Sequence, residues 1–231
     1  IGPRTRALLI NSPNNPTGVI YPAALLTQLG AVLAEKSMAF GAPIYLISDE
    51  PYRELAYDGA AAPWVPDCYA DTIVVYSWSK SLSLPGERIG YLLLPSTLTG
   101  FAELSQGCTI AGRVLGFVNA PSLMQLAVAR CLDAATNLAA YDANRKALYE
   151  VVTRAGFSCV YPAGAFYLWL RAPDGDDQAL ANRAKAHHLL LVPGSSFEGP
   201  GYVRLAYCVS PDMIARSEAA FLALGREYGL C

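Results

Sequence analysis

Short runs of apolar residues, each ended abruptly by polar or turn-forming residues, mark the first hundred positions of the chain. Such runs are typical of buried strands in a parallel sheet, where both faces of each strand are covered. They predict strands over 6–10, 44–47, 72–76 and 89–94. Between the first two, apolar residues recur at helical spacing over 22–39. The alternation indicates a largely parallel sheet with helices on both faces.

Outside these strands and the first helix, the pattern of apolar residues is different. Residues 53–71 are rich in proline and aromatic residues, which predicts an irregular loop. Helical spacing covers 97–137 with a break at Pro121, and resumes over 141–155, where Gly156 is a plausible cap. Strands are then expected over 158–161, 166–170, 189–192 and 203–206. Two further helices are expected over 179–186 and 211–228. These elements predict a second, smaller α+β domain. The predicted domains are therefore 1–139 and 140–231.

Composition narrows the class of protein. The 231 residues are 53% hydrophobic and only 16% charged, with a net charge of −2. This balance argues against nucleic acid or an anionic membrane as the main partner. The surplus of apolar residues is most simply used by a subunit or domain interface.

Cysteine and histidine do not form a recognisable metal site. The six cysteines are scattered without a C-x-x-C pair, and we expect them to be small buried residues rather than metal ligands or disulfides. His187 and His188 are adjacent and are expected at a helix end. No apolar run approaches the ~18 residues of a membrane span, and no signal peptide opens the chain. We therefore expect a cytoplasmic protein.

The most distinctive stretch follows the predicted strand 72–76. Ser77, Ser79 and Lys80 come directly after it, and Arg88 precedes the next strand. Hydroxyls and a guanidinium can hold phosphate, and an amine can form an imine with a carbonyl. For this stretch alone, surface charges and loop serines are about as plausible an interpretation.

Other polar residues also follow predicted strands. Asn15 lies in a loop with two prolines after the first strand, and Asp49 and Tyr52 follow the second. Ligands of open α/β sheets bind at these carboxyl ends. Arg204 instead lies inside an apolar run, where a charge is costly unless it is paired. Its partner is either a substrate carboxylate or an internal salt bridge.

Four motifs together resemble the aspartate-aminotransferase-like family of pyridoxal-phosphate enzymes, the class I/II aminotransferases of fold type I. They are Asn14–Gly18, Ser48–Tyr52, Tyr76–Gly90 and Val203–Leu205, in the family's order and spacing. The resemblance covers nearly the whole chain but only the later part of the family's fold. It implies an α/β fold: a remnant of the mostly parallel large-domain sheet, flanked by helices, followed by the smaller domain. The family's first strands, phosphate-binding loop and ring-stacking aromatic would precede residue 1, so we expect weak cofactor binding or none, and self-association through an exposed sheet edge.

The resemblance also implies a role for each residue. Lys80 would bind pyridoxal 5'-phosphate as a Schiff base and then carry a proton to and from the substrate α-carbon. Asp49 would keep the pyridine nitrogen protonated, and Tyr52 and Asn15 would contact the phenolic oxygen. Ser77, Ser79 and Arg88 would bind the phosphate. Arg204, with Asn15, would bind the substrate carboxylate.

The function implied is transfer of an amino group from an amino acid to a 2-oxo acid, by a homodimer. A carbon–sulfur β-lyase or a cyclopropane-forming synthase uses the same residues. The effector domain of a transcription regulator has the same fold, but nothing basic or helix-turn-helix-like supports it here. A degenerate homologue is disfavoured because the site residues are present together. Phe166, Tyr167 and Phe197 are candidates for pocket lining or for the core.

Overall fold

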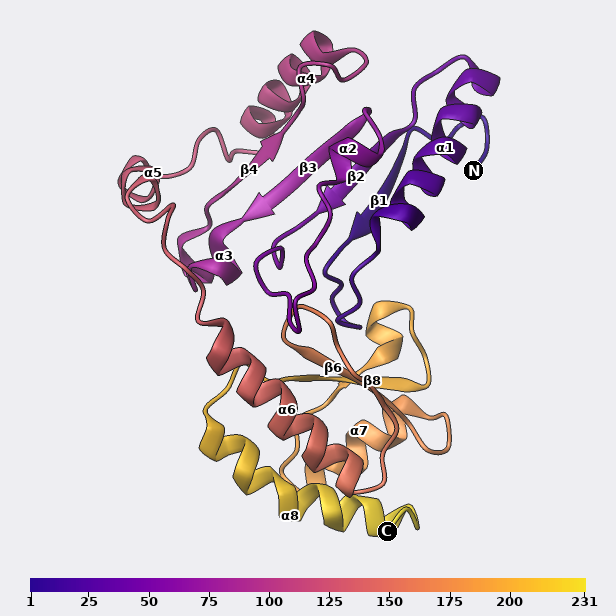
Figure 1. Cartoon of the computed structure of the whole chain (residues 1–231), viewed down its shortest axis with the longest axis vertical. Helices are drawn as coiled ribbons and strands as arrows, with labels where there is room; N and C mark the ends of the chain where they lie inside the picture. The colour runs from indigo at the N-terminus through magenta and orange to yellow at the C-terminus, as the bar shows by residue number, and fades with distance from the viewer. The chain divides into compact units, whose positions relative to one another are not determined.

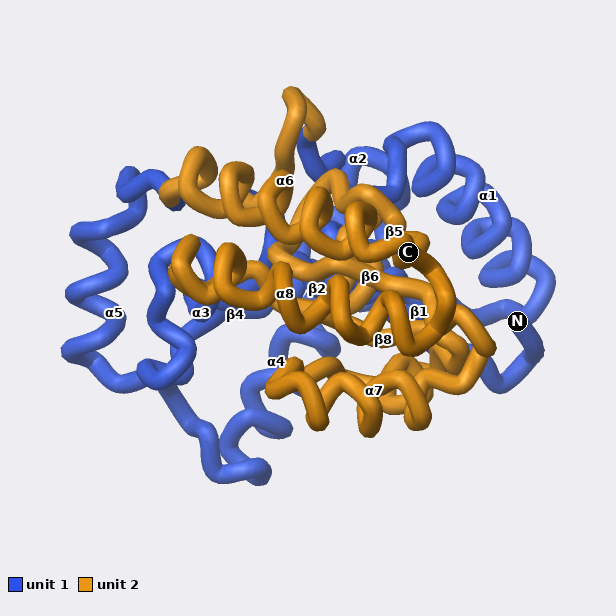
Figure 2. The backbone as a smooth tube through the Cα atoms, turned by 90° about the horizontal axis from the view of Figure 1, so that it is seen from below, with its two compact units in different colours: residues 1–13, 20–54, 61–136 blue, residues 14–19, 55–60, 137–231 orange.

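The computed structural model describes residues 1–231 and contains two compact units (Figures 1 and 2). Unit 1 comprises 1–13, 20–54 and 61–136, and unit 2 comprises 14–19, 55–60 and 137–231. The sequence predicts one boundary near residue 140. The chain passes between the units at four further points, so two short segments of its first half belong to the unit formed by its last part.

Unit 1 is built on a four-stranded sheet in the order β1-β2-β3-β4. The strands are β1 (Ala7–Asn11), β2 (Tyr45–Asp49), β3 (Thr72–Ser77) and β4 (Gly90–Leu93). The first three are parallel, as the apolar runs predict, and β4 is antiparallel to β3. Between β3 and β4 the chain turns through the short α3 (Trp78–Ser81) and η1 (Pro85–Glu87) without a crossover helix, and strands joined in this way run antiparallel.

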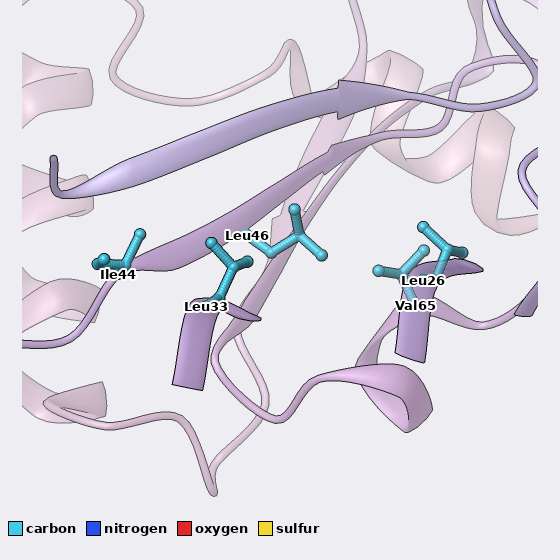
Figure 3. Close-up of a cluster of buried hydrophobic side chains, with 5 residues drawn as sticks. All are labelled: Leu26, Leu33, Ile44, Leu46 and Val65. Carbon is cyan, nitrogen blue, oxygen red and sulfur yellow. The ribbon is translucent and has the colours of Figure 1, made fainter. Parts of the chain in front are cut away.

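One face of this sheet is covered by helices. Helix α1 (Ala23–Phe40) ends at Gly41, whose φ of 67° few other residues adopt readily. Its buried leucines pack with side chains beside and on β2 and with the short α2 (Val65–Cys68) (Figure 3). The cluster consists of Leu26, Leu33, Ile44, Leu46 and Val65. Burying a side chain of this size stabilises the fold by about 1.5–3 kcal/mol.

The opposite face of the sheet is more exposed. The strand register places Leu9 and Leu92 on this face, and their side chains are 64% and 52% exposed. At these two positions, no helix covers the face on which the sequence predicts further helices. The side chains of Asn11 and Asp49 belong to the same face, with Asn11 two residues after Leu9 on β1 and Asp49 opposite it on β2.

Two segments of unit 1 differ from the predicted secondary structure. The expected loop 53–71 contains α2, which begins with Pro66 in its first turn. The expected helical stretch 97–137 contains only α4 (Phe101–Val114) and α5 (Ser122–Ala129). Residues 115–121 and 130–137 are not helical, because glycine and proline interrupt the first segment and few backbone hydrogen bonds continue the second.

Unit 2 has its own four-stranded antiparallel sheet in the order β5-β6-β8-β7. Its elements are α6 (Leu138–Arg154), β5 (Cys159–Val160), β6 (Tyr167–Arg171), α7 (Asp177–Ala186), β7 (Val192–Pro193), η2 (Gly194–Phe197), β8 (Tyr202–Ala206) and α8 (Pro211–Glu227). The strand expected over 189–192 is wrong: only Val192 and Pro193 pair, and Leu190 is 84% exposed.

A fully buried arginine ties the short segment 55–60 to unit 2. Arg145 on α6 donates to the carbonyl of Pro162 at 2.8 Å and pairs with Asp58 at 2.8 Å. It also pairs with Asp142, one turn earlier on the same helix. Its guanidinium carbon lies 4.5 Å from the centre of the Tyr57 ring and 4.5 Å from the centre of the Tyr161 ring. A buried charge with partners on every side fixes the segments that supply them.

The remaining sequence expectations concern single residue types. His187 caps α7 at its C-terminal end, as predicted. All six cysteines are free, and none is fully buried, so the expectation of buried cysteines is wrong. No group of acidic residues, histidines and cysteines is arranged to hold a metal ion. None of the helices combines the length and the apolar character that a bilayer crossing requires.

Candidate active site

Three strands of unit 1 end in polar residues at one edge of the sheet. Asn11 ends β1, Asp49 ends β2 and Ser77 ends β3. Asn11 is in register with Asp49, and Asp49 with Val75, two residues before Ser77. Side chains two residues apart share a face, so all three residues belong to the same side of the sheet. This is the edge at which open α/β sheets bind ligands.

Asp49 is half-buried at this edge. Its carboxylate accepts a hydrogen bond from Asn11 Nδ2 at 2.9 Å. Burial raises the pKa of Asp49, the Asn11 hydrogen bond acts to lower it, and neighbouring Glu50 acts to raise it. A carboxylate in this setting gains most from a neighbouring positive charge.

Lys80 lies near Tyr52, which follows β2. The amine Nζ is 5.9 Å from the centre of the Tyr52 ring, and the Tyr52 side chain is 4% exposed. Lys80 itself is half-buried on α3, one turn after β3 ends. The predicted residues Asp49, Tyr52 and Lys80 thus come from adjacent strand ends of a single unit.

The two predicted phosphate-binding serines form a pair of hydroxyls. Ser77 Oγ caps α3 by accepting from the Ser79 backbone N–H at 3.1 Å, and the two Oγ atoms are 2.6 Å apart. Arg88 follows η1 with a left-handed φ of 51°, and its Nη1 donates to the Pro85 carbonyl at 2.6 Å. Arg88 is exposed. It lies two residues before Gly90, which pairs with Ser77 across β3 and β4.

Tyr76, at the end of the predicted strand 72–76, supports this turn. Tyr76 is buried at the end of β3, and its hydroxyl donates to Glu54 Oε1 at 2.6 Å and lies 2.8 Å from Ser81 Oγ. Burial and the Glu54 carboxylate raise the pKa of Tyr76, so its hydroxyl keeps its proton. Thr136 Oγ1 donates to the Ser81 carbonyl at 2.9 Å. These contacts hold the helical turn that carries Lys80.

Asn15 belongs to the segment of the first half that is part of unit 2. Its loop closes on itself, since the Gly18 N–H donates to the Asn14 carbonyl at 2.9 Å. Gly18 also receives the close approach of Pro162: a Cβ at Gly18 would lie 2.3 Å from Pro162 Cβ, and its φ is 70°. Glycine is therefore required at this position.

Arg204 lies half-buried on β8, and Asn15 is its hydrogen-bond partner. Arg204 Nη1 donates to Asn15 Oδ1 at 2.8 Å. The rings of Tyr167 and Phe197 each have their centres 4.5 Å from the guanidinium. None of the ion pairs of unit 2 involves Arg204, so the alternative of an internal salt bridge finds no support. Two of the residues considered for a pocket thus flank the arginine.

The predicted site residues consequently form two groups, each within its own unit. Unit 1 contains Asp49, Tyr52, Ser77, Ser79, Lys80 and Arg88, and unit 2 contains Asn15 and Arg204. A family model described as aminotransferase class I and II matches residues 2–220. The chain belongs to this family. The α/β fold and the resemblance drawn from the four motifs are thereby confirmed.

Relatives in the aminotransferase family match most of the chain. It is 35% identical to an aspartate aminotransferase of Geobacillus stearothermophilus, over 93% of this chain and 56% of the relative. It is 33% identical to a probable aspartate/prephenate aminotransferase of Thermus aquaticus, over 96% of this chain and 57% of that protein. The chain therefore spans little more than half the length of these relatives.

Solved structures of aminotransferases also match nearly the whole chain. An amino transferase from Eubacterium rectale is 46% identical with a TM-score of 0.95, and the match covers 99% of this chain and 57% of that one. The aspartate aminotransferase of Thermus thermophilus with maleate has a TM-score of 0.82 at 30% identity, covering 97% and 58%. Aminotransferases of this class depend on pyridoxal phosphate.

Proposed function

We propose that this chain carries the lysine-bearing and carboxylate-binding parts of a pyridoxal-phosphate-dependent aminotransferase, which transfers an amino group from an amino acid to a 2-oxo acid. The observation that carries the proposal is the group formed by Asp49, Tyr52 and Lys80 at the carboxyl edge of the unit 1 sheet. Family membership supports it independently.

The residues present fit pyridoxal phosphate by their chemistry. When bound, this group supplies an aldehyde that an amine can capture and a protonated ring that withdraws electrons. Lys80 is the amine. Asp49 is a half-buried carboxylate that favours a cationic neighbour such as a protonated ring nitrogen. The Ser77 and Ser79 hydroxyls and the exposed Arg88 guanidinium suit a phosphate.

Each side chain then has a defined task. Lys80 would hold the cofactor through its amine, and once substrate has taken its place this amine would carry a proton from and to the substrate α-carbon. Tyr52 would donate its hydroxyl hydrogen to the phenolic oxygen of the cofactor and so favour the ionised form of that oxygen. Asp49 would keep the proton on the ring nitrogen.

Arg204 is the group proposed to bind the α-carboxylate of the substrate. Its planar fork suits a carboxylate, and Asn15 holds one of its nitrogens. The Tyr167 and Phe197 rings limit the directions from which water and ligands reach the guanidinium. Aspartate is the first amino donor to test, because several relatives are named aspartate aminotransferases.

We further propose that the protein acts as a homodimer. Large apolar side chains are exposed along residues 110–126 of unit 1, among them Val114 at 80% and Phe117 at 77%. Apolar surface of this extent favours contact with another subunit. The cytoplasmic location expected from the sequence stays a prediction.

Borohydride trapping tests the proposal. The chain has four lysines, so Lys36, Lys146 and Lys185 serve as internal controls. After incubation with pyridoxal phosphate and reduction, mass spectrometry is expected to find the modification on Lys80, with little on the other three. Labelling spread evenly over all four lysines would contradict the proposal for this chain.

A second measurement identifies the reaction once Lys80 is labelled. With aspartate as donor, formation of a 2-oxo acid together with aminated cofactor indicates amino transfer. Ammonia with pyruvate from a β-substituted amino acid would instead indicate β-elimination. The variant Lys80→Ala is the control, since it removes the proposed amine and is expected to lose either reaction.

A further inference from the structure

Asn11 makes two hydrogen bonds to a single residue, Asp49. Its Nδ2 donates to the Asp49 backbone carbonyl at 2.9 Å and to Asp49 Oδ2 at 2.9 Å. The two residues are in register across β1 and β2, at the last position of each strand. One amide nitrogen that reaches both the backbone and the carboxylate restricts the rotation of the Asp49 side chain. Oδ2 is the carboxylate oxygen that Asn11 holds.

In this contact Asn11 acts only as a hydrogen-bond donor. The Nδ2 group of asparagine donates and cannot accept, so it favours the ionised form of the carboxylate at Oδ2. Burial and Glu50 act in the opposite direction on the pKa of Asp49. Glu50 is itself engaged by Ser48 Oγ at 2.7 Å and by Arg53 Nε at 2.6 Å. The position of β3 that pairs with Asp49 is Val75, which carries no charge.

We propose that Asn11 is a positioning residue for the cofactor site, which holds Asp49 ionised and aimed at the ring nitrogen. This role depends on the function proposed above for Asp49. The competing role is purely structural: the bond to the Asp49 backbone carbonyl alone would make Asn11 a link between two strand ends. The carboxylate contact separates the two roles, because only a positioning residue changes how Asp49 binds protons.

Titration of the chain without cofactor tests the proposal directly. With aspartate labelled at the carboxyl carbon, NMR follows each side chain, and Asp49→Asn identifies the Asp49 signal by its loss. In Asn11→Ala the pKa of Asp49 is expected to rise, because the favourable donor is gone. In Asn11→Asp it is expected to rise further, because a second carboxylate replaces the amide with little change in shape.

A matched control is available in unit 2. Asn144 is a buried asparagine whose Nδ2 also makes two hydrogen bonds, to the carbonyls of Tyr207 at 3.0 Å and Val209 at 2.7 Å. Asn144→Ala is expected to lower stability without moving the Asp49 titration. An unmoved Asp49 titration in either Asn11 variant would overturn the proposal, so Asn11→Asp still allows refutation should Asn11→Ala fail to fold.

Cofactor binding provides the second readout. Asn11→Ala is expected to weaken the affinity for pyridoxal phosphate by about tenfold, the effect of losing one charge-assisted hydrogen bond. If the unaltered chain does not bind the cofactor, the proposed function fails for this chain while the Asp49 titration still decides the role of Asn11. If the chain binds it and the titration does not move, only the role of Asn11 is refuted.

Discussion

Asp49 and Arg204 each bring a charge into a half-buried position without an opposite charge beside it. Asp49 meets a neutral amide, and Arg204 meets a neutral amide and two aromatic rings. Such positions cost stability in the chain alone, because burial removes water from a charge that then lacks a counter-charge. They are the positions at which a charged ligand contributes most, and active sites commonly sacrifice stability in this way.

Asp49 provides a test of that cost. Burial raises the pKa of Asp49, so the folded chain holds the proton more tightly than the unfolded chain does. The free energy of unfolding therefore falls as pH rises through the range between the unfolded and folded pKa values. Asp49→Asn does not titrate and is expected to be more stable than the original chain at pH 7, with a smaller advantage at pH 3.

Urea unfolding at the two pH values measures this difference. Asp67, exposed in the first turn of α2, is the control position, and Asp67→Asn is expected to show no such pH-dependent gain. An advantage of Asp49→Asn that stays the same at pH 7 and pH 3 would show that ionisation is not the cause. The same variant is expected to bind pyridoxal phosphate more weakly, since the neutral amide cannot hold the proton on the ring nitrogen.

At the scale of elements, α7 and η2 hold Phe197 in place beside Arg204. Asp177 at the start of α7 is buried and accepts from the Ser195 N–H at 2.8 Å and from the Gly201 N–H at 3.4 Å. η2 ends at Phe197, whose ring lies against the Arg204 guanidinium. One carboxylate thus joins a helix to the segments on both sides of that phenylalanine.

Replacing Asp177 tests this connection. In Asp177→Asn the new amide group faces one of the two N–H donors with a donor of its own, and the expected loss is about 1–3 kcal/mol of stability. Asp176→Asn is the matched control, because Asp176 caps α7 and asparagine caps a helix equally well. Equal losses in the two variants, measured by urea unfolding, would contradict the proposed connection.

The pH dependence of the same contact has the opposite sign to that of Asp49. Burial acts to raise the pKa of Asp177, but the Ser195 and Gly201 hydrogen bonds outweigh it and hold that pKa below its usual range. The stabilisation is therefore complete above the usual aspartate pKa and is lost as pH falls through the lowered one. The difference between Asp177→Asn and the original chain is expected to shrink in strong acid.

Sequence patterns predicted the elements where local chemistry determines them. Apolar runs ended by proline or glycine gave β1 to β4 within a residue or two, and helical spacing gave α1, α6, α7 and α8. The run Leu189–Leu191 misled, because Leu189 and Leu191 are buried from a loop, with Leu190 exposed between them, and this burial needs no strand pairing. Asn11 was passed over because its role depends on the register between β1 and β2, which no single segment reveals.

At the scale of the whole molecule, the sequence does not show that 14–19 and 55–60 belong with the C-terminal part. Their membership depends on contacts between distant residues: Gly18 with Pro162, and Tyr57 and Asp58 with Arg145. One consequence is functional. Asn15 reaches Arg204 within unit 2 although 189 positions separate the two residues in the chain.

Arg145 offers a test of this division. Arg145→Met keeps much of the side-chain length but removes the hydrogen bonds to Pro162, Asp58 and Asp142 and leaves the carbonyl of Pro162 without this donor. The expected loss is about 3 kcal/mol of stability, confined to unit 2. Hydrogen exchange followed by mass spectrometry is expected to quicken in 137–231 and also in 14–19 and 55–60. Exchange in β1 to β3 is expected to stay unchanged.

The same substitution on the surface of α6 provides the control. Arg154 pairs with Glu218 at an exposed position, and such pairs contribute less than about 1 kcal/mol. Arg154→Met is therefore expected to leave exchange nearly unaltered throughout. The opposite outcome is that 14–19 and 55–60 keep their protection in Arg145→Met while 137–231 loses it. These segments would then belong with unit 1. Asn15 would lack the fixed support from unit 2 that its contact with Arg204 implies.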